Sequence, residues 1–365
     1  MTLRSFACSL AALFLLTQFA RSQESTTVGG YGELHYNEPD GNAKGVLDFH
    51  RFVIYLGHVF NDKLAFKSEM EIEHTKIEAG ATDGGEVAVE QAYLDWHLSD
   101  KLGLRAGILL VPIGILNQFH EPPTFHGVER PMIDQVVIPT TWRESGAGIY
   151  GTLAEGVRYQ LSVVAGLKAE GLSEQGIRDG RQEAFESSPA NPSFTGRIEA
   201  MPMLGLTCTG SFFAGQTTDG VDSLGGGTLT LLSADVQYSS GALSLTAVGV
   251  LDSIAGAELL NAAFNRGVAD QLYGLSVEGA YNILPFLAPG EGEQSLHLFA
   301  RYERYNTQAK VTGFTANASF DRHDVTVGAT FQPTFNTAVK FDYQFMNNAA
   351  GAQAKRLNVG IGYSF

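Results

Sequence analysis

The segment 355–365 at the end of the chain constrains the fold more than any other. Its apolar side chains stand at every second position and are separated by polar residues and glycine: Leu357, Val359, Ile361, Tyr363 and Phe365. Successive side chains of a β-strand point to opposite faces, so this period of two predicts a strand with one apolar side. The strand ends on an aromatic terminal residue, which is unusual for a strand of a soluble β-sandwich.

The same alternation recurs along the chain. It predicts 16 strands: 28–36, 46–59, 64–77, 86–98, 102–111, 144–153, 157–166, 193–200, 204–214, 227–239, 242–252, 268–281, 295–304, 321–332, 336–345 and 354–365. Most run to about 10 residues, the length that crosses the apolar layer of a membrane when tilted. The number is even, as bacterial single-chain barrels require.

Hydropathy agrees with a barrel. The mean hydropathy is −0.01, and no stretch of about 18 apolar residues follows residue 22, so no spanning helix is expected. Strands that alternate between lipid and a wet lumen average to a neutral hydropathy. We therefore predict an all-β fold, a transmembrane antiparallel β-barrel of about 16 strands. A secreted soluble β-sandwich is the alternative, and it would need no detergent.

The predicted connections alternate between short and long. Short polar turns such as 61–63 and 154–156 are expected on the periplasmic side. Long extracellular loops are expected at 37–45, 78–85, 112–143, 167–192, 215–226, 253–267 and 305–320. Short helices are expected within two of them, around 172–185 and 254–264.

The first 22 residues read as a secretory signal peptide. Arg4 supplies a positive start, an apolar run follows to Leu16, and Ala20 and Ser22 suit a cleavage site. The barrel is then 23–365, and the expected location is the outer membrane of a Gram-negative bacterium. With Cys8 removed, Cys208 is alone and reads as inert. A net charge of −15 argues against a nucleic-acid partner.

The loop 112–143 is too long and too apolar for a freely moving surface loop, and it is rich in proline. Folded into the barrel mouth, it would narrow a channel. A loop packed on the rim or against a neighbouring subunit is the alternative.

The sequence offers no catalytic motif, no cofactor motif and no metal-binding motif. Gly146–Gly151 matches G-x-G-x-x-G, but no helix follows it, as a dinucleotide site requires. His120, Glu121 and His126 lie together in the long loop. They could bind a metal, but packing of the loop is the favoured role.

Charged residues on the predicted inner faces suggest how a pore would select solutes. Glu69, Glu71 and Glu73 share one strand face and predict an acidic lumen wall. The candidate constriction pairs loop residues with wall residues: Glu121, Glu129 and Arg130 facing Arg51, Arg105 and Arg143. Opposite charges across a lumen bias ion entry. Plain solvation of the wall is an equally open reading.

Several segments resemble the phosphate-selective porin O and P family. They are Gly30-Tyr31-Gly32-Glu33-Leu34-His35-Tyr36, Asp48-Phe49-His50-Arg51-Phe52, 69–74, Glu90-Gln91-Ala92-Tyr93-Leu94-Asp95 and Arg105-Ala106-Gly107. The resemblance implies a 16-stranded barrel with inward-folding loops, often trimeric. Tyr363 and Phe365 resemble the signal read by the barrel-assembly machinery. The chain lacks the basic ladder of phosphate-selective members, so the resemblance leaves the solute open.

The expected function is passive diffusion of small hydrophilic solutes or ions through a water-filled barrel, with a preference for anions or phosphate left open. It needs no enzymatic turnover and no cofactor. The expected partners are outer-membrane lipid, the assembly machinery, the solutes and, as an option, two further copies in a homotrimer. Alternatives are a barrel with a plugged lumen that serves adhesion or structure, and an outer-membrane hydrolase.

Overall fold

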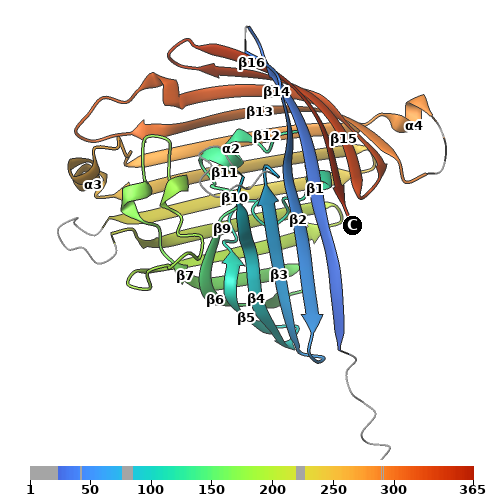
Figure 1. Cartoon of the computed structure of the whole chain (residues 1–365), viewed down its shortest axis with the longest axis horizontal. Helices are drawn as coiled ribbons and strands as arrows, with labels where there is room; N and C mark the ends of the chain where they lie inside the picture. The colour runs from blue at the N-terminus through green and yellow to red at the C-terminus, as the bar shows by residue number, and fades with distance from the viewer. Residues whose placement is uncertain (1–23, 42, 76–84, 219–226, 289, 291) are drawn as a thin grey trace, which may run out of the picture.

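The computed structural model describes residues 24–41, 43–75, 85–218, 227–288, 290 and 292–365, and in them sixteen strands form one closed antiparallel barrel (Figure 1). The strands are β1 Ser25–Pro39, β2 Val46–Val59, β3 Leu64–Glu73, β4 Val87–Ser99, β5 Leu102–Leu110, β6 Arg143–Ala154, β7 Val157–Ala165, β8 Pro192–Met203, β9 Leu206–Gln216, β10 Thr228–Ser240, β11 Leu243–Ala255, β12 Gln271–Asn282, β13 Ser295–Lys310, β14 Asp321–Thr334, β15 Thr337–Asn348 and β16 Gln353–Ser364. The predicted barrel is confirmed. The predicted signal peptide lies outside the described residues.

The barrel closes where its first strand meets its last. β1 pairs with β16, with Tyr31 opposite Ser364 and Pro39 opposite Arg356. Backbone hydrogen bonds between Gly30 and Phe365 extend this seam to the final residue. Every strand therefore has two neighbours, which leaves no open sheet edge.

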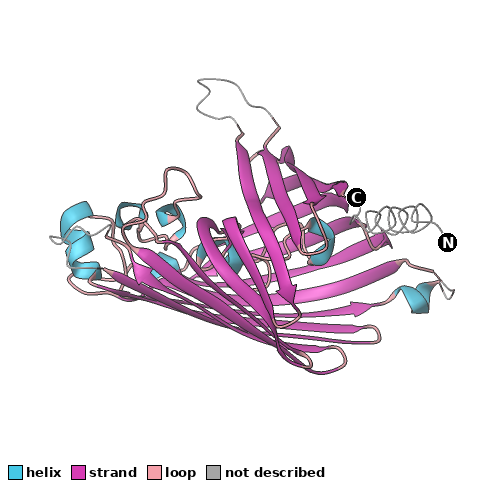
Figure 2. Cartoon of the chain, turned by 90° about the horizontal axis from the view of Figure 1, so that it is seen from below, coloured by secondary structure: helices cyan, strands magenta, loops and turns pink. Residues whose placement is uncertain are grey.

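The two ends of the barrel differ. At one end, the loop end, most connections are long: 74–86, 111–142, 166–191, 217–227, 256–270 and 311–320. At the other, the turn end, most are short: 60–63, 100–101, 155–156, 204–205, 241–242 and 335–336. Figure 2 shows helical segments gathered at the loop end.

Three details differ from the predicted connections. At the turn end, 283–294 is a long connection with a helix, α4 Leu284–Leu287. The loop predicted at 305–320 is shorter, because β13 continues to Lys310. The helix expected around 172–185 is replaced by two single turns, η2 Ala169–Gly171 and η3 Arg178–Gly180. The helix α3, Ala257–Phe264, lies in the second segment where one was expected.

The outer surface of the wall is apolar. Along β16, Val359 and Ile361 are exposed, whereas Asn358 and Gly360, which alternate with them, are buried against the interior. β13 shows the same pattern, with Leu298 and Tyr302 outside and Arg301 inside. A face of this kind is what hydrocarbon requires. Among the described residues, no helix is both long and apolar enough to cross a membrane.

The interior is less uniformly polar than the sequence predicted. Apolar side chains on the inner faces of β9, β10 and β11, such as Phe213, Leu231 and Val250, pack with loop residues such as Ile133 and Leu172 in one buried cluster. This cluster fills the loop end of the barrel on that side. The polar part of the interior lies along β1–β4 and β13–β16, where the buried residues include Glu33, Glu71, Arg301 and Asp342.

Candidate functional site

The connection 111–142 between β5 and β6 is here called the crossing segment. One buried side chain holds its first and last residues together. The Asn117 amide donates to the carbonyl oxygens of Val111 (2.6 Å) and Trp142 (2.9 Å), and its oxygen accepts from the Trp142 amide at 2.6 Å. Asn117 is fully buried. It therefore fixes the direction in which the segment leaves the wall.

The crossing segment contacts strands on the far side of the ring. Its helix α2, Met132–Val136, packs against β12 and β13, and its single turn η1, Pro122–Thr124, packs against β1, β15 and β16. The Asp342 carboxylate of β15 accepts from the Val128 amide at 2.6 Å. Arg301 of β13 donates to the His126 carbonyl at 2.6 Å. The segment thus spans the interior from β5 and β6 to the opposite wall (Figure 1).

Glycines on the inner faces of the far strands make room for this path. A Cβ atom at Gly362 would lie 2.3 Å from Cβ of Pro122, and one at Gly360 would lie 2.8 Å from a methyl carbon of Val128. At Gly274 of β12 it would lie 2.6 Å from the Ile133 side chain. Real Cβ atoms do not approach carbon this closely, so each glycine is needed for the observed packing.

Replacement of Gly362 by leucine should push the η1 turn away from β16. We expect the bond between Phe125, which is 9% exposed, and His126 to become cleavable by chymotrypsin in the folded, detergent-solubilised protein, because Pro122 is rigid and cannot yield. Gly210→Leu is the control, since nothing lies within 4 Å of a Cβ atom there. Equal resistance to chymotrypsin after Phe125 in both variants would contradict this packing.

A polar cavity of about 420 Å³, the loop-side cavity, lies between the crossing segment, the connection 166–191 and strands β2–β4. Its lining is almost entirely charged: Arg51, Glu71, Glu73, Glu86, Glu90, Arg130, Arg143, Arg178, Asp179, Arg181 and Glu183, with Thr140 and Thr141. The structure thus brings three of the predicted constriction residues, Arg51, Arg130 and Arg143, into one cavity. The acidic pair Glu71 and Glu73 faces the same space.

The charges of this cavity are unevenly neutralised. Arg51 is paired with Glu33 (Nε–Oε1 2.6 Å) and Glu71 (Nη1–Oε1 3.0 Å) on the wall. Arg130 is 8% exposed, and its Nε and Nη2 atoms have no hydrogen-bond partner among the described residues. Its Nη1 donates to the Thr141 hydroxyl at 3.2 Å. Arg130 is therefore a buried positive charge with no ion-pair partner among the described residues, although the whole lining holds six carboxylates and five arginines.

Two further arginines join Arg130 from the connection 166–191. Arg178 donates to the carbonyl oxygens of Thr140 (2.7 Å) and Gln135 (3.2 Å), and Arg181 donates to those of Thr141 and Pro139. These carbonyl oxygens accept the N–H groups of the two arginines but carry no negative charge, so the guanidinium charges are not neutralised by them. Arg181 and Arg143 share a single carboxylate, Glu183, at 2.7 and 3.4 Å.

A second cavity of about 310 Å³, the turn-side cavity, follows the same wall toward the turn end. It is lined by Tyr55, Lys67, Glu69, His120 and Glu121 among others. The Tyr55 hydroxyl donates to Glu121 at 3.2 Å. Glu121 therefore faces a different space from Arg130.

Three buried residues separate these two cavities. Glu69 and His120 line the turn-side cavity, and Glu90 lines the loop-side cavity. The Nε2 atom of His120 lies 3.2 Å from Glu69 Oε1 and 3.5 Å from Glu90 Oε2. We call this group the partition. It connects the crossing segment, through His120, to strands β3 and β4.

A β-bulge produces this arrangement. The ladder pairs Glu69 with Gln91 and Met70 with Val89, so Glu90 has no partner on β3. An extra residue of this kind turns neighbouring side chains to the same face. Gln91 donates to the second oxygen of Glu69 at 2.6 Å, while Glu90 approaches His120.

Burial of the His120 imidazole opposes its charged form, but the neighbouring carboxylates of Glu69 and Glu90 outweigh that effect. They raise the pKa of His120 to about 10. At neutral pH a proton on the ring therefore holds the two carboxylates together.

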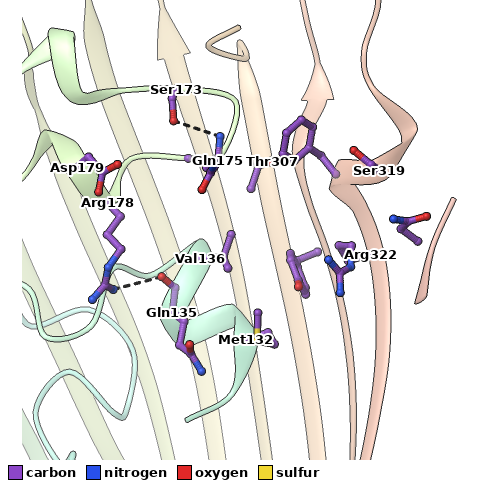
Figure 3. Close-up of a pocket in the computed structure, with 14 residues that line it drawn as sticks. Met132, Gln135, Val136, Ser173, Gln175, Arg178, Asp179, Thr307, Ser319 and Arg322 are labelled. Carbon is purple, nitrogen blue, oxygen red and sulfur yellow. Dashed lines mark hydrogen bonds between the residues drawn. The ribbon is translucent and has the colours of Figure 1, made fainter. Parts of the chain in front are cut away.

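A third cavity, of about 370 Å³, opens near the loop end between α2 and strands β13 and β14. Figure 3 shows Met132 and Val136 of α2 on one side and Thr307 and Arg322 on the other. Arg178 and Asp179 line both this cavity and the loop-side cavity. The two spaces therefore adjoin at the connection 166–191.

The remaining predicted site residues are dispersed. Arg105 lies toward the turn end, where it pairs with Asp95 at 3.2 Å and lies over the Tyr150 ring. Glu129 contacts His35 at 3.3 Å near β1. Neither faces Arg51 or Arg143. Phe365 is exposed at the seam, and its role and that of Tyr363 in assembly stay predictions.

Sequence reasoning missed Glu90, Arg178 and Arg181 as site residues. For Glu90 a signal exists. Apolar positions are odd-numbered up to Val89 and even-numbered from Leu94, so the alternation changes phase at Glu90 and Gln91. No comparable signal marks the two arginines, because they lie in a connection without periodicity.

Comparison with known proteins places the chain among porins. Residues 27–359 match the family "Phosphate-selective porin O and P". An uncharacterized protein of Aquifex aeolicus (strain VF5) is 35% identical over 337 residues, which are 88% of this chain and 76% of that protein.

Solved structures with a similar fold are more distant in sequence. OmpF of Salmonella typhi, in complex with daunomycin, has a TM-score of 0.64 at 11% identity, covering 93% of this chain and 97% of that one. An anion-selective porin from Comamonas acidovorans has 0.60 at 14%, covering 94% and 100%. The trimer form of OmpT of Vibrio cholerae has 0.58 at 11%, covering 94% and 100%.

Proposed function

Since this chain belongs to the phosphate-selective porin O and P family, and is therefore an outer-membrane channel protein, we propose that it lets small hydrophilic solutes diffuse through its lumen and favours anions. The observation that carries the preference is Arg130, a buried guanidinium in the loop-side cavity. Among the described residues, no carboxylate lies within ion-pair distance of it. Positive charge without a matching carboxylate attracts anions and repels cations.

The proposed path follows β2–β4. It leads from the loop-side cavity past the partition to the turn-side cavity, and the crossing segment forms its inner wall. Diffusion of this kind requires neither turnover nor a cofactor. The loop end then faces the outside of the cell and the turn end the periplasm.

The proposed constriction differs from the one expected from the sequence. Arg51, Arg130 and Arg143 remain in it, joined by Arg178 and Arg181, while Arg105, Glu121 and Glu129 fall outside it. Glu71 and Glu73 form its acidic side, and Glu69 belongs to the partition.

Planar-bilayer recording of the refolded protein in a tenfold KCl gradient tests the proposal. We expect discrete conductance steps and a reversal potential displaced toward the chloride equilibrium potential, whose limit is about 59 mV for a perfectly selective pore. A reversal potential displaced toward potassium would contradict the anion preference. Absence of steps from a folded barrel would favour a plugged barrel with an adhesive or structural role, for which the apolar cluster inside the barrel gives some support.

We also propose assembly as a homotrimer. The trimeric form of OmpT, with a similar fold, supports it, as does an apolar hollow of about 690 Å³ on the outer faces of β3–β9. Its lining includes Leu94, Trp96, Ile149, Leu161 and Phe194. Conductance steps that come in groups of three would agree with this assembly, and single steps would contradict it.

A further inference from the structure

We propose that the partition of Glu69, Glu90 and His120 is a binding site for a divalent first-row transition-metal ion such as Zn²⁺. One donor atom from each residue lies within 4.8 Å of the other two. The group joins the crossing segment to the wall, so a bound ion would cross-link the two. This inference does not depend on which ions the channel prefers.

The distances suit such an ion. Ligand atoms at about 2.1 Å from a tetrahedral Zn²⁺ are about 3.4 Å from one another. The imidazole Nε2 lies 3.2 Å from Glu69 Oε1 and 3.5 Å from Glu90 Oε2. The three donors can therefore bind one ion with small adjustments. One imidazole with two carboxylates favours Zn²⁺ and its neighbours over Mg²⁺ or Ca²⁺, which prefer oxygen alone.

Unsatisfied polar atoms are the second observation that points to a ligand. Glu90 is 0% exposed, and among the described residues its Oε1 has no polar partner while its Oε2 has only the 3.5 Å contact with His120. The hydroxyl of Tyr31, also 0% exposed, lacks one as well, and its ring lies 5.9 Å from that of His120. Buried polar groups are normally satisfied, so a group this incomplete lacks a component.

The surroundings already provide the support that metal ligands need. Gln91 donates to the second oxygen of Glu69 at 2.6 Å, which leaves Oε1 directed at His120. Such outer contacts orient ligands. The ion would replace the proton that His120 carries in the metal-free protein.

The test is zinc binding to the folded, chelator-treated protein in detergent, measured by titration calorimetry and by metal content after desalting. We expect about one Zn²⁺ per chain in the wild type, and none in Glu90→Gln or His120→Gln. Gln91→Ala, which removes an orienting contact, should bind about 10- to 100-fold more weakly.

His74→Gln is the matched control. Asp48, His50 and His74 form a second candidate group near the loop end, with two imidazoles and greater exposure. Zinc binding that persists in His74→Gln supports the proposal. Binding that is lost in His74→Gln and kept in Glu90→Gln, or no binding by the wild type, would overturn it.

X-ray absorption of the zinc-loaded wild type decides the matter even where the partition variants fail to fold. The partition predicts a single imidazole among oxygen ligands. Two or more imidazoles would assign the ion to the group around His74 and overturn the proposal.

Discussion

Removing the charges of Arg130 and Arg143 together, as Arg130→Gln and Arg143→Gln, should move the reversal potential in a tenfold KCl gradient toward potassium. We expect a shift on the order of 10–20 mV, within the limit of about 59 mV on either side. The reason is that Arg130 is buried without a carboxylate partner in the described part of the chain, while the acidic wall of the same cavity keeps its charge. Glutamine preserves much of the volume and hydrogen bonding, so the variant isolates charge.

Arg105→Gln provides the comparison. It removes one positive charge from an inner face, but Arg105 lies toward the turn end and is paired with Asp95. Its effect on the reversal potential should be clearly smaller than that of the double variant. A shift per charge at Arg105 equal to that at Arg130 and Arg143 would mean that selectivity arises along the whole lumen and not in the loop-side cavity.

The architecture could be predicted because the wall of a barrel is governed by local rules. Each strand must alternate between lipid and lumen, so the period of two marks its limits and its faces. β2 was predicted at 46–59, and the structure has it at Val46–Val59. The assignment of Glu69 and Glu71 to the inner face follows from the same rule, and both are buried there.

Bulges are the point at which this rule fails, and not every bulge leaves a trace in the sequence. In β2 the ladder pairs Glu33 with Arg51 and Leu34 with Phe49, so His50 is extra. Residues 52–56 are all apolar or aromatic, so the sequence shows no change of phase at this bulge. The register of Arg51 therefore could not be read from the alternation, in contrast to the visible change at Glu90 and Gln91 in β4.

The interior could not be predicted to the same extent, because its contacts join residues far apart in the chain. No feature of the sequence around Val128 predicts that its amide donates to Asp342, which is 214 residues away. The apolar inner faces of β9–β11 were also missed, because an apolar residue at an inner position looks like an error in alternation. Leu231 is such a residue, and it is explained only by the loop that packs on it.

Asn117→Ala should have the largest effect on stability of any single change considered. The Asn117 side chain accepts a hydrogen bond from the Trp142 amide and donates one to the Val111 carbonyl, at the two ends of the crossing segment. Alanine would leave the buried Trp142 amide unpaired and remove one of two donors to the Val111 carbonyl, which also accepts from the Ile113 amide at 2.8 Å. The cost should be about 2–4 kcal/mol in the free energy of unfolding. Urea unfolding of the protein in detergent, followed by tryptophan fluorescence, measures this free energy. The fully buried Trp142 lies at one end of the crossing segment and reports on its unfolding.

Gln118→Ala is the matched control for this loss. Gln118 also carries an amide, but it donates to the side chain of Gln160 at 2.9 Å and supports no backbone group in the described structure. Its removal should cost roughly 0.5–1.5 kcal/mol. Unfolding of both alanine variants at the same urea concentration would contradict this prediction. The apolar packing around Trp142 would then hold the two ends of the crossing segment, and its direction would not depend on Asn117.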